Sequence, residues 1–189
     1  MPVVGKFLSE DYFKNYYGKG RPMTEENLIW DTKNFLYQLN PFIQKSPHRL
    51  SFVDLGAGTG LIVKRLREQG IDADGYEINN YALENAVTEL IDKDITKPLD
   101  RRYDIGFANV FMYMTNLQIH KFFDNNQYNI DVLVIAYPFE GNNDPERIND
   151  LDVGYFNKLA DHFGYMMYQI NKGFIVFVRG VDVGDLPFK

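Results

Sequence analysis

Short apolar runs alternate with amphipathic segments along the chain from about residue 49 onward. Apolar runs rich in valine, isoleucine and phenylalanine are typical of strands, whereas apolar positions spaced about three or four residues apart indicate helices. Their alternation predicts strand and helix units that build a parallel sheet covered on both faces. The predicted strands cover residues 50–55, 72–78, 88–95, 102–114 and 129–139, and the predicted helices cover residues 61–70, 79–87, 116–126 and 152–164.

The pattern changes after the last predicted helix. Two apolar runs, residues 165–170 and 174–180, flank an Asn-Lys-Gly turn and predict an antiparallel hairpin. Residues 129–139 have the continuous apolar character of a central strand, and Pro138 marks the point where its pairing stops. The predicted fold is therefore α/β and doubly wound, with a mostly parallel seven-stranded sheet that ends in this C-terminal antiparallel hairpin.

The N-terminal quarter of the chain lacks this alternation. Residues 1–47 are aromatic and polar, with chain-breaking residues at 18–22 and 46–47, and we expect them to form an arm or lid on the core. Residues 48–189 are expected to form the main body of a single globular domain. A chain of 189 residues with 45% hydrophobic residues supplies one sizeable core.

The composition of the chain argues against several kinds of partner, binding site and catalytic group. The net charge of -6 argues against a nucleic-acid partner, because such partners are attracted by basic surfaces. The absence of cysteine excludes disulfides, thiolate zinc sites and thiol nucleophiles, and we expect no bound metal. No segment reads as a signal peptide or a membrane span, so we expect a soluble, cytoplasmic protein.

Three glycines, Gly56, Gly58 and Gly60, stand at alternate positions directly behind the strand predicted at 50–55. Glycine there lets backbone N–H groups approach a ligand at the carboxyl edge of the sheet. A dinucleotide fingerprint would need a small residue in place of Leu61, and a phosphate loop would need Gly-Lys-Ser/Thr. A nicotinamide oxidoreductase is therefore a weak alternative, as is a tight turn without a ligand.

The segment FVDLGAGTG, residues 52–60, resembles motif I of the class I S-adenosylmethionine-dependent methyltransferases, with Asp54 as its acidic residue. Similarity to this family extends over residues 49–180. It implies a Rossmann-like methyltransferase fold, S-adenosylmethionine as the methyl donor and S-adenosylhomocysteine as the product.

The resemblance also implies roles for particular residues. Glu77 matches the carboxylate that accepts hydrogen bonds from both ribose hydroxyls of the donor, a task suited to an acceptor-only group. Asp94 and Ile95 match the residues at the adenine ring, with Asp92 as the alternative register. The implied cofactor-binding residues are Asp54, Gly56, Ala57, Gly58, Gly60, Glu77, Ile78, Asp94, Ile95, Asn109 and Tyr16.

Methyl transfer from a sulfonium is a direct displacement that needs no covalent residue, so positioning and exclusion of water are the main tasks of the protein. The acceptor side should come from the loops after the fourth and fifth strands and from the arm. Its candidates are Asn109, Phe111, Tyr113, Tyr137, Pro138, Glu140, Tyr12, Tyr16 and Tyr17. The candidate general bases are His120, Tyr113 and Tyr17, and His48 and His162 are weaker ones.

The preferred interpretation is an enzyme that methylates N or O of a small molecule. The segment ANVFMY, residues 108–113, replaces the Pro-Pro motif of amino-methylating DNA enzymes, and cytosine C5 methylation needs a thiolate. A protein, peptide or nucleic-acid methyltransferase, or a catalytically silent binding module, remains an alternative. The sequence indicates no particular oligomeric state.

Overall fold

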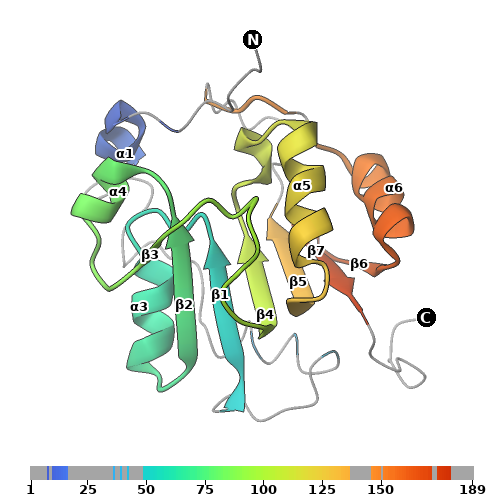
Figure 1. The fold of residues 1–189 in the computed structure, drawn as a ribbon, viewed down its shortest axis with the longest axis horizontal. Coiled ribbons are helices and arrows are strands. Elements are labelled where there is room, and N and C mark those ends of the chain that lie inside the picture. The colour runs from blue at the N-terminus through green and yellow to red at the C-terminus, as the bar shows by residue number, and fades with distance from the viewer. Residues whose placement is uncertain are drawn as a thin grey trace.

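The computed structural model describes residues 8, 10–16, 36, 39, 42, 49–136, 146–149, 151–171 and 174–179. Within these residues, one seven-stranded sheet has the order β3-β2-β1-β4-β5-β7-β6 (Figure 1). Its strands are parallel except for β7, which is antiparallel to both of its neighbours. The predicted fold class is confirmed. The strands are β1 (Ser51–Leu55), β2 (Asp72–Glu77), β3 (Ile91–Asp92), β4 (Tyr103–Ala108), β5 (Ile130–Ala136), β6 (Met166–Asn171) and β7 (Phe174–Val178).

Helices cover both faces of this sheet (Figure 1). One face is covered by α5 (Asn116–Asn126) and α6 (Val153–Phe163), whose buried side chains form a core rich in phenylalanine. The other face is covered by α3 (Leu61–Glu68), and the buried residues of its mainly aliphatic core include Leu36, Leu39 and Phe42. The remaining helices are α1 (Glu10–Tyr16), α4 (Asn80–Glu84) and the 3-10 helix η2 (Phe111–Tyr113).

Two predicted strands are shorter than expected. The strand predicted at 102–114 ends at Ala108. The apolar residues that follow it form η2 instead, a helical turn in which the side chains of Phe111 and Met112 are buried. The strand predicted at 88–95 pairs with β2 only at Ile91 and Asp92. Pro138 and the Lys-Gly of the predicted hairpin turn lie outside the described residues. Apolar periodicity did not distinguish a buried strand end from a buried turn.

The order of the strands creates a crevice between β1 and β4. The chain passes from β1 through α3 to β2 on one side, and from β4 through α5 to β5 on the other side. The connections at the carboxyl ends of β1 and β4 therefore diverge, which is where open α/β sheets bind ligands. No helix in the described part of the chain has the length and apolar character needed to cross a membrane.

A buried asparagine fixes the loop that follows β3. The Asn126 side chain on α5 is 1% exposed and accepts a hydrogen bond from Leu99 N at 2.8 Å. Its amide nitrogen donates to the carbonyl oxygens of Ile95 and Lys97, each at 3.0 Å. Asn126 therefore holds the loop that contains Ile95 against the helical layer.

Asn126→Ala should lower the free energy of unfolding by about 2 to 4 kcal/mol, because it leaves buried backbone groups without partners. Urea denaturation followed by circular dichroism measures this loss. The neighbouring Asn125 is exposed and donates one hydrogen bond, to Thr96 O at 2.7 Å, so Asn125→Ala should cost less than about 1 kcal/mol. Equal losses in both variants would contradict the role given to Asn126.

Candidate functional site

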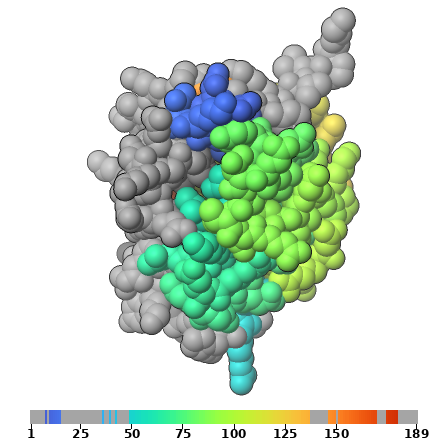
Figure 2. Space-filling view, turned by 90° about the vertical axis from the view of Figure 1, so that its left-hand side faces the viewer, coloured from blue at the N-terminus to red at the C-terminus, as the bar shows by residue number. Residues whose placement is uncertain are grey.

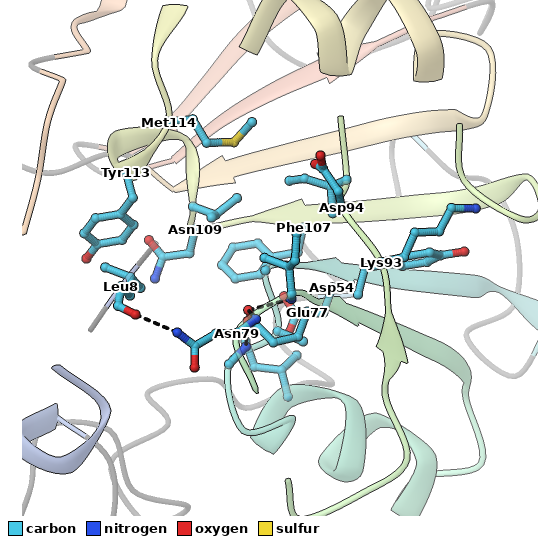
Figure 3. Close-up of a pocket in the computed structure, with 18 of the residues that line it drawn as sticks. Leu8, Asp54, Glu77, Asn79, Lys93, Asp94, Phe107, Asn109, Tyr113 and Met114 are labelled. Carbon is cyan, nitrogen blue, oxygen red and sulfur yellow. Dashed lines mark hydrogen bonds between the residues drawn. The ribbon is translucent and has the colours of Figure 1, made fainter. Parts of the chain in front are cut away.

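A cavity opens at the carboxyl ends of β1, β2 and β4, in the crevice described above. Its empty space, including the open solvent at its mouth, is about 1110 Å³. In Figure 3, Asn109 and Tyr113 lie at one end, Lys93 and Asp94 lie at the other, and Glu77 lies between them. The predicted site residues that line it are Asp54, Gly56, Ala57, Gly58, Glu77, Ile78, Asp94, Ile95, Asn109, Tyr113 and Tyr12.

The glycine loop folds tightly over the end of β2. The backbone N–H groups of Gly56 and Ala57 both donate to Tyr76 O, each at 2.9 Å. Gly56 has a φ of 75°, and a Cβ atom at this position would lie 2.8 Å from the side chain of Val110. The site therefore requires glycine at position 56 for its backbone conformation and for the close approach of the loop after β4.

The third glycine, Gly60, has a packing role that the sequence did not indicate. Gly60 does not line the cavity, and it precedes α3 with a φ of 81°. A Cβ atom there would lie 3.0 Å from Thr88 and 3.1 Å from Leu90. Gly60 thus permits close packing behind the loop, and its predicted contact with a cofactor gains no support from its position.

Glu77 at the end of β2 is held in place by backbone groups. Its Oε2 atom accepts from Gly58 N at 2.8 Å, and its Oε1 atom accepts from Ile78 N and Asn79 N, each at 2.8 Å. Burial raises the pKa of Glu77, and these three hydrogen bonds oppose that effect. A carboxylate offers about four acceptor positions, so Oε2 retains capacity for a hydroxyl group in the cavity.

Asp54 is a second buried carboxyl group at the cavity. It is 3% exposed on β1, and burial raises its pKa to about 7, with a further contribution from the negative charge of Glu77. None of the residues that the structure describes donates a hydrogen bond to the Asp54 carboxyl group. A positively charged ligand would stabilise its ionised form.

The charges around the cavity favour a cation over an anion. Two buried carboxyl groups, Asp54 and Glu77, line the cavity. Lys93 also lines it, but its ammonium group pairs with Asp100. Buried like charges repel strongly at low local dielectric, so the phosphates of a dinucleotide would meet repulsion here.

The structure distinguishes the two alternative registers after β3. Asp94 and Ile95 line the cavity, whereas Asp92 is exposed and does not line it. Asp94 Oδ1 accepts from Thr96 N at 2.8 Å, which closes a tight turn and fixes the carboxyl group. The geometry therefore favours the register with Asp94.

Part of the N-terminal arm forms a wall of the cavity. Tyr12 from α1 lines it, and its hydroxyl group lies 3.1 Å from that of Tyr113. Helix α1 lies on α4 at the surface (Figure 2), where the ring of Phe13 lies 6.3 Å from that of Tyr81. Lys14 Nζ lies 5.6 Å from the same Tyr81 ring. Leu8 and α1 of the arm therefore cover the carboxyl edge of the sheet, whereas Leu36, Leu39 and Phe42 belong to the core on the α3 face.

The turn that contains Tyr113 is held by a segment that follows β5 in sequence. The carbonyl oxygen of Met112 accepts from Ile148 N at 3.0 Å and from Asn149 N at 3.2 Å. The Asn149 side chain also donates to the carbonyl oxygen of Met114. These bonds fix the backbone on both sides of Tyr113 and so orient its ring.

The two histidines that the structure describes, His120 and His162, do not line the cavity. His120 on α5 faces α6, where its ring lies 5.7 Å from the rings of both His162 and Phe163. Neither histidine lines the cavity, so the structure gives no support to a general base at His120. Phe111 is fully buried in the core and does not line the cavity either. The Tyr16 side chain and residues Tyr17, His48, Tyr137, Pro138 and Glu140 lie outside the described residues.

Several lining residues were not anticipated from the sequence. Leu8 and Phe13 lie far from the glycine loop in sequence, and only the aromatic character of the arm pointed to them. Asn79 caps α4, because its side chain accepts from Ala82 N. Its second contact, from Nδ2 to Leu8 O at 2.6 Å, left no signal in the sequence.

No family model and no curated protein sequence matches the chain. Its fold is similar to solved methyltransferases. The magnesium protoporphyrin IX methyltransferase of Synechocystis PCC 6803, solved with bound S-adenosylmethionine, shares 15% identity at a TM-score of 0.64, covering 94% of this chain and 100% of that chain.

Two further solved structures agree with this comparison. An S-adenosylmethionine-dependent methyltransferase of Aquifex aeolicus shares 15% identity at a TM-score of 0.62, covering 90% of this chain and 97% of that one. DesVI of Streptomyces venezuelae shares 12% identity at a TM-score of 0.65, with coverage of 79% and 91%. The chain therefore has the fold of the S-adenosylmethionine-dependent methyltransferases, as its motifs implied.

The raised pKa of Asp54 predicts a pH-dependent stability. Between about pH 4 and the folded pKa of about 7, the folded protein keeps a proton that the unfolded chain releases, so stability should fall as pH rises through this window. Asp54→Asn removes this penalty. The melting temperature of Asp54→Asn minus that of the parent should therefore be several degrees higher at about pH 8 than at about pH 5.

Differential scanning fluorimetry across this pH range measures the effect. Asp161→Asn, a matched change at an exposed position on α6, serves as the control. A difference between Asp54→Asn and the parent that is independent of pH would show that Asp54 does not bury its charge in the folded protein.

Proposed function

We propose that the chain is an S-adenosylmethionine-dependent methyltransferase that transfers a methyl group to N or O of a small-molecule acceptor. The observation that carries this proposal is the pair of buried carboxyl groups, Asp54 and Glu77, that face one cavity at the switch point of a methyltransferase fold.

The residues present fit this cofactor. Glu77 would accept hydrogen bonds from the ribose, and its carboxylate is already oriented by three backbone N–H groups. Asp94 and Ile95 would hold the adenine, and Asp54 suits a ligand with positive charge. When bound, S-adenosylmethionine supplies a methyl group on a positively charged sulfur. A nicotinamide dinucleotide is less well supported, because Leu61 stands where its glycine fingerprint needs a small residue and the charge of Asp54 would repel its phosphates.

The contribution of the protein is positioning and the exclusion of water. Backbone hydrogen bonds fix the glycine loop and Glu77, so the site needs little reorganisation to bind a ligand. Tyr12 and Phe13 of α1 cover the cavity with aromatic surface, which removes water from the reacting groups. Tyr113 is the one candidate base among the described residues that lines the cavity, where its hydroxyl group contacts that of Tyr12.

The covered cavity supports a small acceptor over a macromolecular one. A wall formed by α1 limits access at the carboxyl edge, where a protein or nucleic acid would have to enter. The acceptor in the name of one structural neighbour, magnesium protoporphyrin IX, is also a small molecule. Both observations favour the same class of acceptor here.

Glu77→Gln should weaken S-adenosylhomocysteine binding by about 10- to 100-fold, because it removes a charge-assisted acceptor. Isothermal titration calorimetry measures the affinity. Glu84→Gln, an exposed change on the adjacent α4, should leave it unaltered. Unchanged affinity in Glu77→Gln would remove Glu77 from the site, and binding of NAD without S-adenosylhomocysteine would favour an oxidoreductase.

Transfer itself is tested with radiolabelled S-adenosylmethionine and a fractionated cell extract. The expected result is label in the small-molecule fraction that depends on the protein and is lost with Glu77→Gln. Label in the protein or nucleic-acid fraction would contradict the proposed acceptor class. Binding without label in any fraction would indicate a silent binding module.

A further inference from the structure

Asn79 connects the cavity to the N-terminal arm through three different groups. Its backbone N–H donates to Glu77 Oε1 at 2.8 Å. Its side-chain oxygen accepts from Ala82 N at 3.1 Å and so caps α4. Its side-chain nitrogen donates to Leu8 O at 2.6 Å. One residue thus contacts the buried carboxylate, the start of a helix and the arm (Figure 3).

The arm rests on the helix that Asn79 caps. Phe13 of α1 is 2% exposed and packs near Tyr81 of α4, and Lys14 lies over the same ring. Leu8 and Phe13 also line the cavity. Helix α4 has five residues, which is too short to be stable without its cap and its packing. Docking of the arm and the position of α4 therefore depend on each other.

The helix cap alone does not explain the choice of asparagine. Serine and aspartate cap helices about as well as asparagine, because each presents an oxygen to the first turn. Only asparagine among these three also presents an amide donor. At position 79 that donor is the group that bonds to the arm.

We propose that Asn79 is a positioning residue that couples docking of the arm to ligand binding at Glu77. This rests on the proposed function for the identity of the ligand. A ligand that bonds to Glu77 also meets Leu8 and Phe13 of the arm, which line the same cavity, and the Asn79 amide holds Leu8 in that place. Because such coupling is reciprocal, docking of the arm raises the affinity for the ligand by the same factor by which the ligand favours docking of the arm.

The first test needs no ligand. Asn79→Ser keeps the backbone bond to Glu77 and an oxygen cap for α4, and it removes only the amide donor. Hydrogen exchange of a peptide spanning residues 8–16 should become about fivefold faster, while exchange at residues 80–84 stays unchanged. Asp152→Ser makes a matched cap replacement at α6 and should alter neither segment. Unchanged exchange at 8–16, or equal acceleration in both segments, would overturn the proposal.

The second test measures coupling. S-adenosylhomocysteine should dissociate about fivefold faster from Asn79→Ser in stopped-flow measurements. Phe13→Ala undocks the arm by another route and should also accelerate dissociation. If Asn79 acts through the arm, the double variant should dissociate no faster than the faster single variant. Rate increases that multiply in the double variant would show that Asn79 acts on the ligand independently, which would overturn the coupling.

The two tests separate this inference from the proposed function. If the parent protein binds no S-adenosylhomocysteine, the proposed function fails. The exchange measurement on the ligand-free protein then still decides whether Asn79 holds the arm.

Discussion

The structure depends on the hydrogen bonds from three backbone N–H groups to the carboxylate of Glu77. A carboxylate buried to this extent would be costly without such partners. Two of the donors follow β2 directly, and the third, Gly58, belongs to the loop after β1. The bonds therefore join two neighbouring strand ends, and the carboxylate that faces the cavity also shapes the cavity.

Much of this arrangement could be predicted from local sequence. Alternating apolar runs gave the layers and the antiparallel hairpin, since each signal lies within about a dozen residues. The resemblance to the methyltransferase motifs implied Asp54, Glu77 and Asp94, and the ends of the parallel strands bring all three to one cavity at the edge of the sheet. The third glycine, Gly60, matched a ligand pattern but packs against Thr88 and Leu90, and a single sequence does not distinguish these two demands.

The contacts that were not predicted are those between distant segments. Leu8 and Asn79 are 71 residues apart, and Tyr12 and Tyr113 are 101 residues apart. Such pairs depend on how the arm returns over the sheet, which no local periodicity encodes. The direction in which α5 presents His120 depends similarly on its packing against α6. A histidine near the active edge in sequence therefore lies away from the cavity in the fold.

The two walls of the cavity have separate supports. Glu77 and Asp54 are fixed by β1, β2 and the glycine loop, whereas the turn that contains Tyr113 is fastened by residues 148 and 149. Replacements in that fastening segment reshape one wall and leave the other intact. Because of this division, protein engineering at residues 148 and 149 could alter the side of the cavity at Tyr113 while the side at Glu77 and Asp54 is kept.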